Sequence, residues 1–187
     1  MRAHEKWIWL LAGMVSGAAG CWLAVSFPGG AGEHRRISFD FREGREYLVQ
    51  RVVDGDTVVI EPGIYVRYAG INTPETHKVI EVQKPYGKEA TEANRKMVEG
   101  RRVQLLFGER PLDGYGRLLA GVRVRDRESG RFVDVGEELA RRGLARAFYK
   151  SDGPPNREAV SRAVEEAKEA RRGIWSRGRD YKRTRSK

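Results

Sequence analysis

The sequence contains few of the residues that build disulfide frameworks or soft-metal centres. Its 187 residues include one cysteine, Cys21, and three widely separated histidines, at positions 4, 34 and 77. A single cysteine excludes an intramolecular disulfide and a zinc site made of a cysteine cluster, and the scattered histidines form no local metal motif. The patterns G-x-x-x-x-G-K-S/T and G-x-S-x-G are also absent. The sequence therefore does not indicate a P-loop enzyme or one with a nucleophile elbow.

The composition is that of a folded, basic protein. Hydrophobic residues make up 40% and charged residues 33% of the chain, which argues against wholesale disorder. Lysine and arginine number 36 against 26 acidic residues, so the formal net charge is +10. The length predicts about one domain with a real core, and the positive charge favours a polyanionic partner.

A long uncharged segment occupies residues 7–27. As a helix it would span roughly 31 Å, close to the hydrocarbon core of a bilayer. We expect an N-terminal hydrophobic helix in residues 1–27 and favour an uncleaved signal anchor over a cleaved secretory signal. Two other interpretations are a lipoprotein signal, with lipidation at Cys21, and a buried core helix. The rest of the protein is accordingly expected to be membrane-anchored and facing outward, or secreted or periplasmic if the N-terminus is removed.

The remaining chain divides into a linker, a folded domain and a tail. Residues 28–44 begin with a Pro-Gly-Gly-Ala-Gly run and are expected to be a linker, followed by a domain at 45–176 and a basic tail at 177–187. From residue 171 to the end there are eight Lys or Arg and one Asp, a net charge of +7. This charge either keeps the tail soluble or captures nucleic acid or anionic lipid.

Within the domain, alternating and β-branched runs separated by turn residues predict five strands, and 3.6-residue periodicity predicts three helices. A meander with helices outside it indicates a small α+β barrel. The expected strands are residues 47–53, 57–60, 64–69, 102–107 and 117–125, and the expected helices are 87–100, 134–142 and 154–172.

Two polar segments next to predicted strands indicate chemistry. Asp54-Gly55-Asp56-Thr57 opens like an EF-hand loop but lacks the ligand and glycine that such a loop needs at its fifth and sixth positions. The segment 67–75 then supplies an arginine, an amide, a carbonyl before proline and a carboxylate. A meander would bring Asp56 near Asn72 and Glu75, and oxygen ligands of these kinds suit a hard cation.

A third segment, 113–117, adds Arg117 at the start of a strand. Carboxylates and two arginines, with no candidate Ser, Cys or His nucleophile, indicate metal-assisted attack of water on a phosphodiester. The alternative is that Arg67 and Arg117 are ordinary ion pairs with Asp54 or Asp113. Four large residues are expected in the core: Tyr65, Phe107, Leu118 and Trp175.

The motifs together resemble the thermonuclease, or staphylococcal-nuclease-like, family. In order they are V-D-G-D-T (53–57), R-x-x-G-I-N-T-P-E (67–75), Y-G-x-E-A (86–90), D-x-Y-G-R (113–117), L-x-x-x-G-L-A (139–145) and G-I-W (173–175). The resemblance covers residues 47–175. It implies an OB-type five-stranded β-barrel with about three α-helices, in agreement with the α+β barrel expected from the patterns.

The resemblance also implies site residues and a cofactor. Arg67, Glu75 and Arg117 match catalytic residues, with Glu75 activating or positioning water and the arginines stabilising the phosphoryl transition state. The implied cofactor is Ca²⁺. Its implied ligands are Asp56, Asn72 and the backbone oxygen of Thr73, and the implied substrate-binding residues are Tyr115 and Tyr149. Lys84 is a further candidate for steering phosphates.

Asn72 departs from the family pattern, which has an aspartate at that position. The site therefore loses one formal negative charge, and we expect weaker metal affinity without loss of activity. The implied activity is low-specificity hydrolysis of single- and double-stranded DNA and of RNA, leaving 3′-phosphates. The alternative is a barrel that binds nucleic acid without catalysis. No obligate protein partner is evident.

Overall fold

A computed structural model describes residues 20–28, 34–74, 86–149 and 156–176 of the chain. The chain divides into two compact units, Met1–Arg45 and Glu46–Lys187, and each is described by itself. Most of the predicted elements fall in the second unit.

The first unit contains an antiparallel hairpin of β1 (Gly20–Pro28) and β2 (His34–Arg42), in which Gly20 pairs with Arg42. The predicted hydrophobic helix over 7–27 is therefore wrong for residues 20–27, and residues 7–19 lie outside the described residues. Aromatic and β-branched residues, which favour strands, are frequent in this stretch. The segment expected as a linker, 28–44, contains β2. Within the described ranges, no helix has the length and apolar character that crossing a membrane requires.

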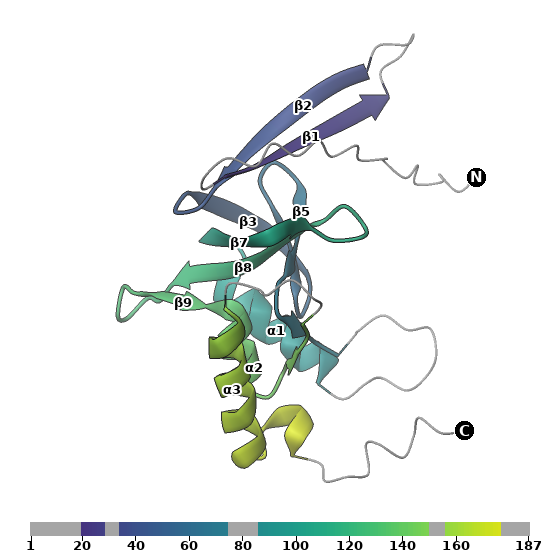
Figure 1. Ribbon diagram of the computed structural model, residues 1–187. Coiled ribbons are helices and arrows are strands. Elements are labelled where there is room, and N and C mark those ends of the chain that lie inside the picture. Colours follow the sequence, from purple (N-terminus) through teal and green to yellow (C-terminus); the bar gives the residue numbers. More distant parts are fainter. Residues whose placement is uncertain (1–19, 29–33, 75–85, 150–155, 177–187) are drawn as a thin grey trace, which may run out of the picture. The chain divides into compact units, whose positions relative to one another are not determined.

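The second unit is built on a closed barrel of five strands (Figure 1). The hydrogen-bonded order is β5-β4-β3-β7-β8, and a parallel pairing of β5 with β8 closes the ring. The other neighbouring pairs are antiparallel. The predicted OB-type α+β barrel is confirmed. Its strands are β3 (Glu46–Asp54), β4 (Thr57–Ile60), β5 (Ile64–Tyr68), β7 (Arg102–Leu112) and β8 (Leu118–Arg125).

Alternation along the strands sorts side chains to the inside and outside of the barrel. In β5, Val66 and Tyr68 are buried whereas Tyr65 is exposed and Arg67 is partly exposed. In β8, Leu118 and Ala120 are buried and Leu119 is less so. A period of two residues therefore gives these strands an apolar inner face and an outer face that carries the arginines.

Three helices lie beside the barrel (Figure 1), as predicted: α1 (Gly87–Val98), α2 (Val135–Arg141) and α3 (Arg157–Glu169). A 3₁₀ turn, Gly173–Trp175, follows α3. Three short strands were not expected: β6 (Ile71–Asn72), β9 (Phe132–Asp134) and β10 (Arg146–Ala147). The β6–β10 pair joins Asn72 to Arg146, and β9 extends the sheet beyond β8.

Gly143 shows why the end of α2 needs glycine. Its φ is +71°, and a Cβ there would lie 2.2 Å from the carbonyl oxygen of Arg172. The close approach lets the amide of Ile174 donate to the Gly143 carbonyl at 2.9 Å. The L-x-x-x-G-L-A and G-I-W motifs therefore meet in space, where they fasten α2 to the C-terminal turn.

Candidate active site

The turn between β3 and β4 is fixed by close packing at Gly55. A Cβ at this position would lie 2.6 Å from Thr73 Oγ1 and 2.8 Å from the Cβ of Ala90. Only glycine lets the turn approach both Thr73 and α1 this closely. The Asp54 carboxylate accepts a hydrogen bond from the Asp56 amide at 3.0 Å, which completes a local turn.

Asp56 is the centre of a buried polar cluster. It is 5% exposed, and its Oδ2 accepts from the Thr73 amide at 2.7 Å and from Thr73 Oγ1 at 3.0 Å. Arg67 Nη1 lies 3.1 Å from the same oxygen. The structure thus brings together residues from the β3–β4 turn, from β5 and from the segment after β6.

Burial raises the pKa of Asp56 to about 6, because desolvation disfavours the charged carboxylate. The Arg67 guanidinium opposes this effect, and the negative charge of Asp54 adds to it. One nearby arginine therefore does not fully compensate the buried charge. A second positive charge at this position would favour the ionised form.

Arg67 joins Asp56 to Asn72. Its Nη2 donates to Asn72 Oδ1 at 2.9 Å, and its Nη1 donates to the Tyr68 carbonyl at 3.1 Å. The Arg67 side chain is only 13% exposed, so it is held between the two oxygen-bearing side chains. The predicted nearness of Asp56 and Asn72 is found, with Arg67 between them and Thr73 bonded to Asp56. The alternative pairing of Arg67 with Asp54 is replaced by a pairing with Asp56.

Arg117 lies in the turn just before β8, the strand that pairs with the one carrying Arg67. Val66 on β5 pairs with Leu118, the first residue of β8; Arg67 follows Val66, and Arg117 precedes Leu118. Arg67 belongs to the outer face of β5, and Arg117 is half-buried. The two predicted arginines therefore adjoin the same Val66–Leu118 pair.

Asp113 holds Arg117 in a tight turn. Its Oδ2 pairs with Arg117 Nε at 2.7 Å, and its Oδ1 accepts from the amides of Tyr115 and Arg117 at 2.9 and 3.0 Å. The ion pair considered from the sequence is therefore present. It uses one of the five N–H donors of the guanidinium, so it orients the arginine; the other four donors have no hydrogen-bond acceptor among the described residues.

The predicted substrate-binding residues are placed differently from one another. Tyr115 is 88% exposed, and the Arg117 guanidinium lies 5.5 Å from its ring. Tyr149 packs on α3, where its hydroxyl donates to the Arg157 carbonyl at 2.9 Å. Its hydroxyl also lies 2.8 Å from Ser161 Oγ. Glu75 and Lys84 lie outside the described residues.

The donor set suits a hard cation. Asp56 supplies a carboxylate, Asn72 an amide oxygen and Thr73 a backbone carbonyl, which are ligand types that Ca²⁺ accepts. Among the described residues, the other Asp56 oxygen, Oδ1, has only a 3.4 Å contact from Thr57 Oγ1, which is too long for a good hydrogen bond. A buried carboxylate oxygen with no close donor, on a carboxyl group of raised pKa, fits a cation ligand.

Two features were missed from the sequence. Tyr65, expected in the core, is 42% exposed, and its hydroxyl accepts from Arg51 Nη2 at 2.9 Å. The signal was available, since Tyr65 shares its strand face with Arg67. The second feature is Asn94, a fully buried amide in α1 that donates to the Asp54 carbonyl at 3.0 Å. It also accepts from the Tyr68 hydroxyl at 2.8 Å.

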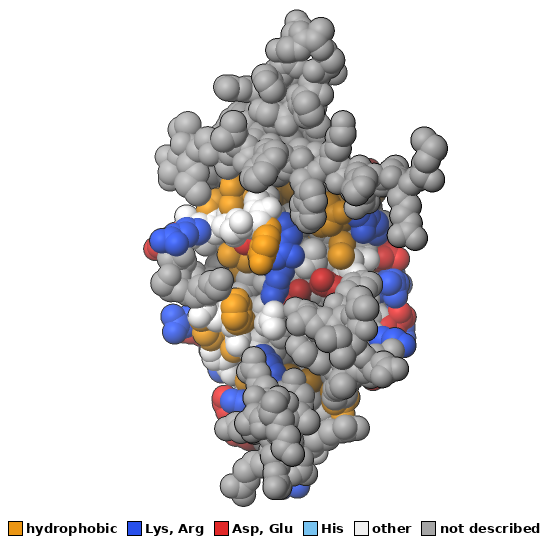
Figure 2. Space-filling model, turned by 90° about the vertical axis from the view of Figure 1, so that its right-hand side faces the viewer, with side chains coloured by type: hydrophobic (Ala, Val, Ile, Leu, Met, Phe, Trp, Pro, Cys, Tyr) orange, Lys and Arg blue, Asp and Glu red, His pale blue; other side chains and the backbone are white. Residues whose placement is uncertain are grey.

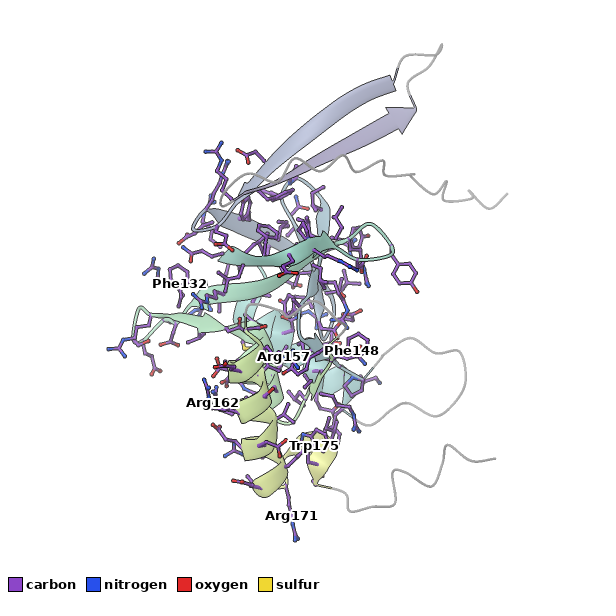
Figure 3. The ribbon with its side chains drawn as sticks, in the orientation of Figure 1. Phe132, Phe148, Arg157, Arg162, Arg171 and Trp175 are labelled. Atoms are coloured by element: carbon purple, nitrogen blue, oxygen red, sulfur yellow. The ribbon has the colours of Figure 1, made fainter. Side chains whose placement is uncertain are left out.

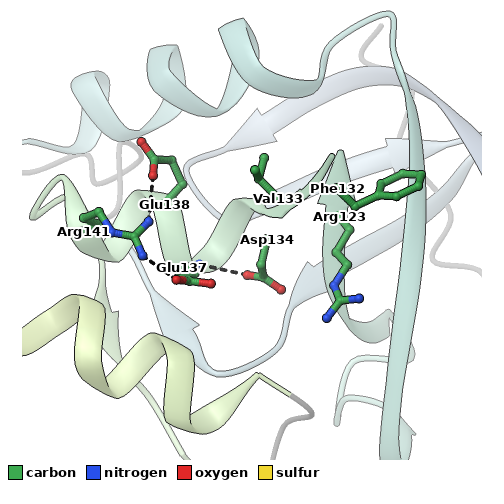
Figure 4. Close-up of a pocket in the computed structure, with 7 residues that line it drawn as sticks. All are labelled: Arg123, Phe132, Val133, Asp134, Glu137, Glu138 and Arg141. Atoms are coloured by element: carbon green, nitrogen blue, oxygen red, sulfur yellow. Dashed lines mark hydrogen bonds and ion pairs between the residues drawn. The ribbon is translucent and has the colours of Figure 1, made fainter. Parts of the chain in front are cut away.

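A separate cavity of about 320 Å³ lies between β8, β9 and α2 (Figure 4). Arg141 on its wall pairs with Glu137 and with Glu138, the latter at 3.0 Å. Asp134 accepts from the Glu137 amide at 2.9 Å and caps α2. These charges satisfy one another, and the cavity contains none of the predicted site residues.

Known proteins resemble the chain over most of its length. A family model described as staphylococcal nuclease homologue matches residues 65–177. Thermonuclease of Staphylococcus intermedius is 39% identical over 162 residues, covering 83% of this chain and 90% of that protein. Thermonuclease of Staphylococcus hyicus is 31% identical over 157 residues, covering 82% and 89%. Endonuclease YncB of Bacillus subtilis strain 168 is 37% identical over 139 residues, covering 68% and 60%.

Proposed function

The chain belongs to the staphylococcal nuclease homologue family and is a nuclease, and from this premise we propose that it hydrolyses DNA and RNA with Ca²⁺ at the Asp56 cluster. The observation that carries the proposal is the convergence of Asp56, Thr73, Asn72 and Arg67 in one hydrogen-bonded group. Such a group combines oxygen ligands with a phosphate-binding guanidinium.

Asp56, Asn72 and the Thr73 carbonyl would hold the cation. A bound Ca²⁺ would polarise a phosphoryl oxygen and make a bound water more acidic. It would also compensate the buried Asp56 charge that Arg67 alone leaves incompletely balanced. The protein's part is to hold Asp56, Asn72 and Thr73 in one hydrogen-bonded group with Arg67.

Arg67 and Arg117 bind the scissile phosphate in this proposal. Arg67 lies on β5 and Arg117 in the turn just before its partner strand β8, and Asp113 orients Arg117 through Nε. Guanidinium groups form paired hydrogen bonds with phosphate oxygens, which become stronger as charge develops in the transition state. The two arginines would thereby stabilise the pentacoordinate phosphorus.

Glu75 acts as the general base or positions the attacking water. It follows Thr73 by two residues, and Thr73 donates twice to Asp56. A carboxylate this near in sequence to the cation ligands is suited to accept the proton of the water. This role rests on the family resemblance.

The substrate is a flexible strand with little sequence requirement. Tyr115 beside Arg117 offers a base-stacking ring next to a phosphate ligand, and Lys84 and Tyr149 add contacts. Stacking and phosphate binding are sequence-tolerant, so single- and double-stranded DNA and RNA are all substrates. Cleavage leaves 3′-phosphates. The enzyme works outside the cytoplasmic membrane, and N-terminal sequencing of the mature protein tests whether its first residues are removed.

Two substitutions test the mechanism. With labelled single-stranded DNA and Ca²⁺, Glu75→Gln lowers kcat by about 10²–10⁴-fold and Arg117→Ala by about 10²–10³-fold. Arg125→Ala, an exposed arginine at the other end of β8, is the matched control and keeps wild-type turnover. Wild-type turnover in both test variants would refute the mechanism. Binding of DNA without cleavage by the unmodified protein would favour the non-catalytic alternative.

A further inference from the structure

An arginine and a tyrosine form an exposed pair on the barrel wall. The Arg51 guanidinium lies 5.5 Å from the Tyr65 ring, and Arg51 Nη2 donates to the Tyr65 hydroxyl at 2.9 Å. Tyr65 remains 42% exposed, and Arg51 is exposed. Among the described residues, Arg51 forms no ion pair with an Asp or Glu, so its charge is not neutralised by a described carboxylate.

Strand register places this pair beside the candidate active site. Arg51 pairs with Val59 on β4, and Val59 pairs with Tyr65 on β5. The next row on the same face contains Thr57 and Arg67. Tyr65 and Arg67 are two residues apart on one strand, which separates them by about 7 Å.

The start of β8 lies next to this row. Val66, which follows Tyr65, pairs with Leu118, and Arg117 lies in the turn one residue before Leu118. The outer face carries Arg51 and Tyr65 in one row, and Arg117 follows in the adjoining turn with Tyr115 beside it. Figure 2 shows Lys and Arg side chains next to hydrophobic ones near the middle of one face of the molecule.

We propose that Arg51 and Tyr65 form an additional nucleic-acid subsite, which binds the part of a single strand adjoining the scissile phosphate. Tyr65 stacks on a base, and Arg51 binds a neighbouring phosphate. Alternating aromatic and cationic side chains are what a single strand requires, because its bases offer ring faces and its backbone offers regularly spaced charge. The position of the scissile phosphate rests on the proposed function. The contact with the nucleic-acid strand rests on the geometry of Arg51 and Tyr65 alone.

A purely structural reading is available and can be tested. Arg51 and Tyr65 flank Val59, which is 4% exposed, so the pair also covers an apolar side chain. Leucine would retain much of that cover but has no ring for stacking, whereas phenylalanine keeps the ring and loses the hydroxyl. Tyr65→Leu and Tyr65→Phe therefore separate the two roles.

The first measurement is binding of a fluorescent dodecathymidylate in chelator, which requires no cleavage. Tyr65→Leu weakens binding roughly tenfold, and Tyr65→Phe stays within about twofold of the wild type. Arg51→Gln lowers the slope of log Kd against log salt concentration by about 0.7, the value for one phosphate contact on a single strand. Wild-type affinity in Tyr65→Leu, or equal weakening in Leu and Phe variants, would overturn the proposal.

The second measurement compares substrate lengths in the presence of Ca²⁺. Tyr65→Leu raises KM for the dodecamer and leaves kcat/KM unchanged for a chromogenic ester of one nucleoside phosphate, which is too short to reach the subsite. An equal loss on both substrates would overturn the subsite and indicate a general structural defect. If no variant cleaves either substrate while Tyr65→Leu still weakens binding, the subsite stands and the proposed hydrolysis fails.

The chain supplies a matched control. Arg125 and Phe132 form another pair of an exposed arginine and an aromatic residue, in which the guanidinium lies 4.4 Å from the ring. Figure 3 labels Phe132, the first residue of β9, and Arg125, at the end of β8, is about 26 Å from Arg117 along the chain at the usual rise per residue. Arg125→Gln and Phe132→Leu leave dodecamer affinity and KM unchanged. A loss of dodecamer affinity equal to that of Tyr65→Leu would show that any exposed arginine–aromatic pair affects binding, and it would overturn the specific subsite.

Discussion

At the residue scale, Asp56 combines a structural cost with its proposed role as a cation ligand. Its carboxylate is buried, and desolvation raises its pKa to about 6 even though Arg67 lies beside it. The folded state therefore binds the Asp56 proton more tightly than the unfolded state, whose pKa is 3.8. The contribution of this group to stability is greatest below about pH 4 and declines as the pH rises towards 6 and above.

Replacing Asp56 by Asn removes that cost in the absence of metal. We expect Asp56→Asn to raise the free energy of unfolding in chelator at pH 7.5 by about 1–3 kcal/mol, and the gain to shrink towards pH 4. Urea unfolding at the two pH values measures it. Calcium should stabilise the wild type and not the variant, because ligand binding to the folded state adds stability. A variant that is less stable than the wild type in chelator at pH 7.5 contradicts this view of the carboxylate.

Asn72 is the residue at which this chain's site carries less charge than the family pattern. Its oxygen lies 2.9 Å from Arg67 Nη2, among the proposed cation ligands. Asn72→Asp adds a negative charge there, and Ca²⁺ affinity increases with ligand charge. The Ca²⁺ concentration for half-maximal cleavage should fall by roughly tenfold, as measured by a calcium titration. An unchanged midpoint would mean that residue 72 does not ligate the cation.

At the element scale, α1 supports the turn that carries Asp56. Asn94 is fully buried and links the Asp54 carbonyl to the Tyr68 hydroxyl. The Tyr68 amide donates to the Asp56 carbonyl at 2.8 Å, so the link joins helix, turn and β5. Burial keeps the pKa of Tyr68 well above its ordinary value, so its hydroxyl stays protonated and donates.

Asn94→Ala leaves the carbonyl of Asp54 and the hydroxyl of Tyr68 buried without this partner. We expect a loss of about 2–4 kcal/mol in the free energy of unfolding. Tyr68→Phe alone costs about 1–2 kcal/mol, and the double variant loses less than the sum because the two share one hydrogen bond. Chemical denaturation of the wild type, the two single variants and the double variant measures this double-mutant cycle. Strict additivity would show that the bond contributes nothing.

Element types were predictable where the pattern was long. The five barrel strands and three helices follow from alternation and from 3.6-residue periodicity, and the structure has all of them, although β7 continues to Leu112, beyond its predicted end at residue 107. β6 and β10 have two residues each, too short for any period to show, and they form only where the barrel brings Ile71 and Ala147 together. The segment 20–27 was misassigned because an unbroken apolar run has no period that distinguishes helix from strand.

Site residues were predictable for a different reason. The meander placed Asp56 near Asn72 and Glu75, and the family resemblance added Arg67 and Thr73. The structure joins Asp56, Arg67, Asn72 and Thr73, whereas Glu75 lies outside the described residues. Tyr65 was assigned to the core by its type. The position of Arg67 on the same strand face indicated that this face points outward, and the residue type outweighed that signal.

At the scale of the whole molecule, the excess positive charge is concentrated near the C-terminus. Residues 177–187 contain six Lys or Arg and one Asp. We expect a protein ending at residue 176 to bind single-stranded DNA more weakly at low salt. Its slope of log Kd against log salt should be flatter by up to about 4, at ~0.7 per phosphate contact. A slope equal to that of the full chain would assign the tail to solubility alone.

The central claim is that a cation held at Asp56 and two arginines hydrolyse a phosphodiester. The most direct measurement is digestion of end-labelled single-stranded DNA by the full chain, with Ca²⁺ or with EDTA, followed by analysis of the new ends. The account predicts rapid cleavage with Ca²⁺, products that end in 3′-phosphate, and no cleavage in EDTA. Cleavage that continues undiminished in EDTA would contradict it.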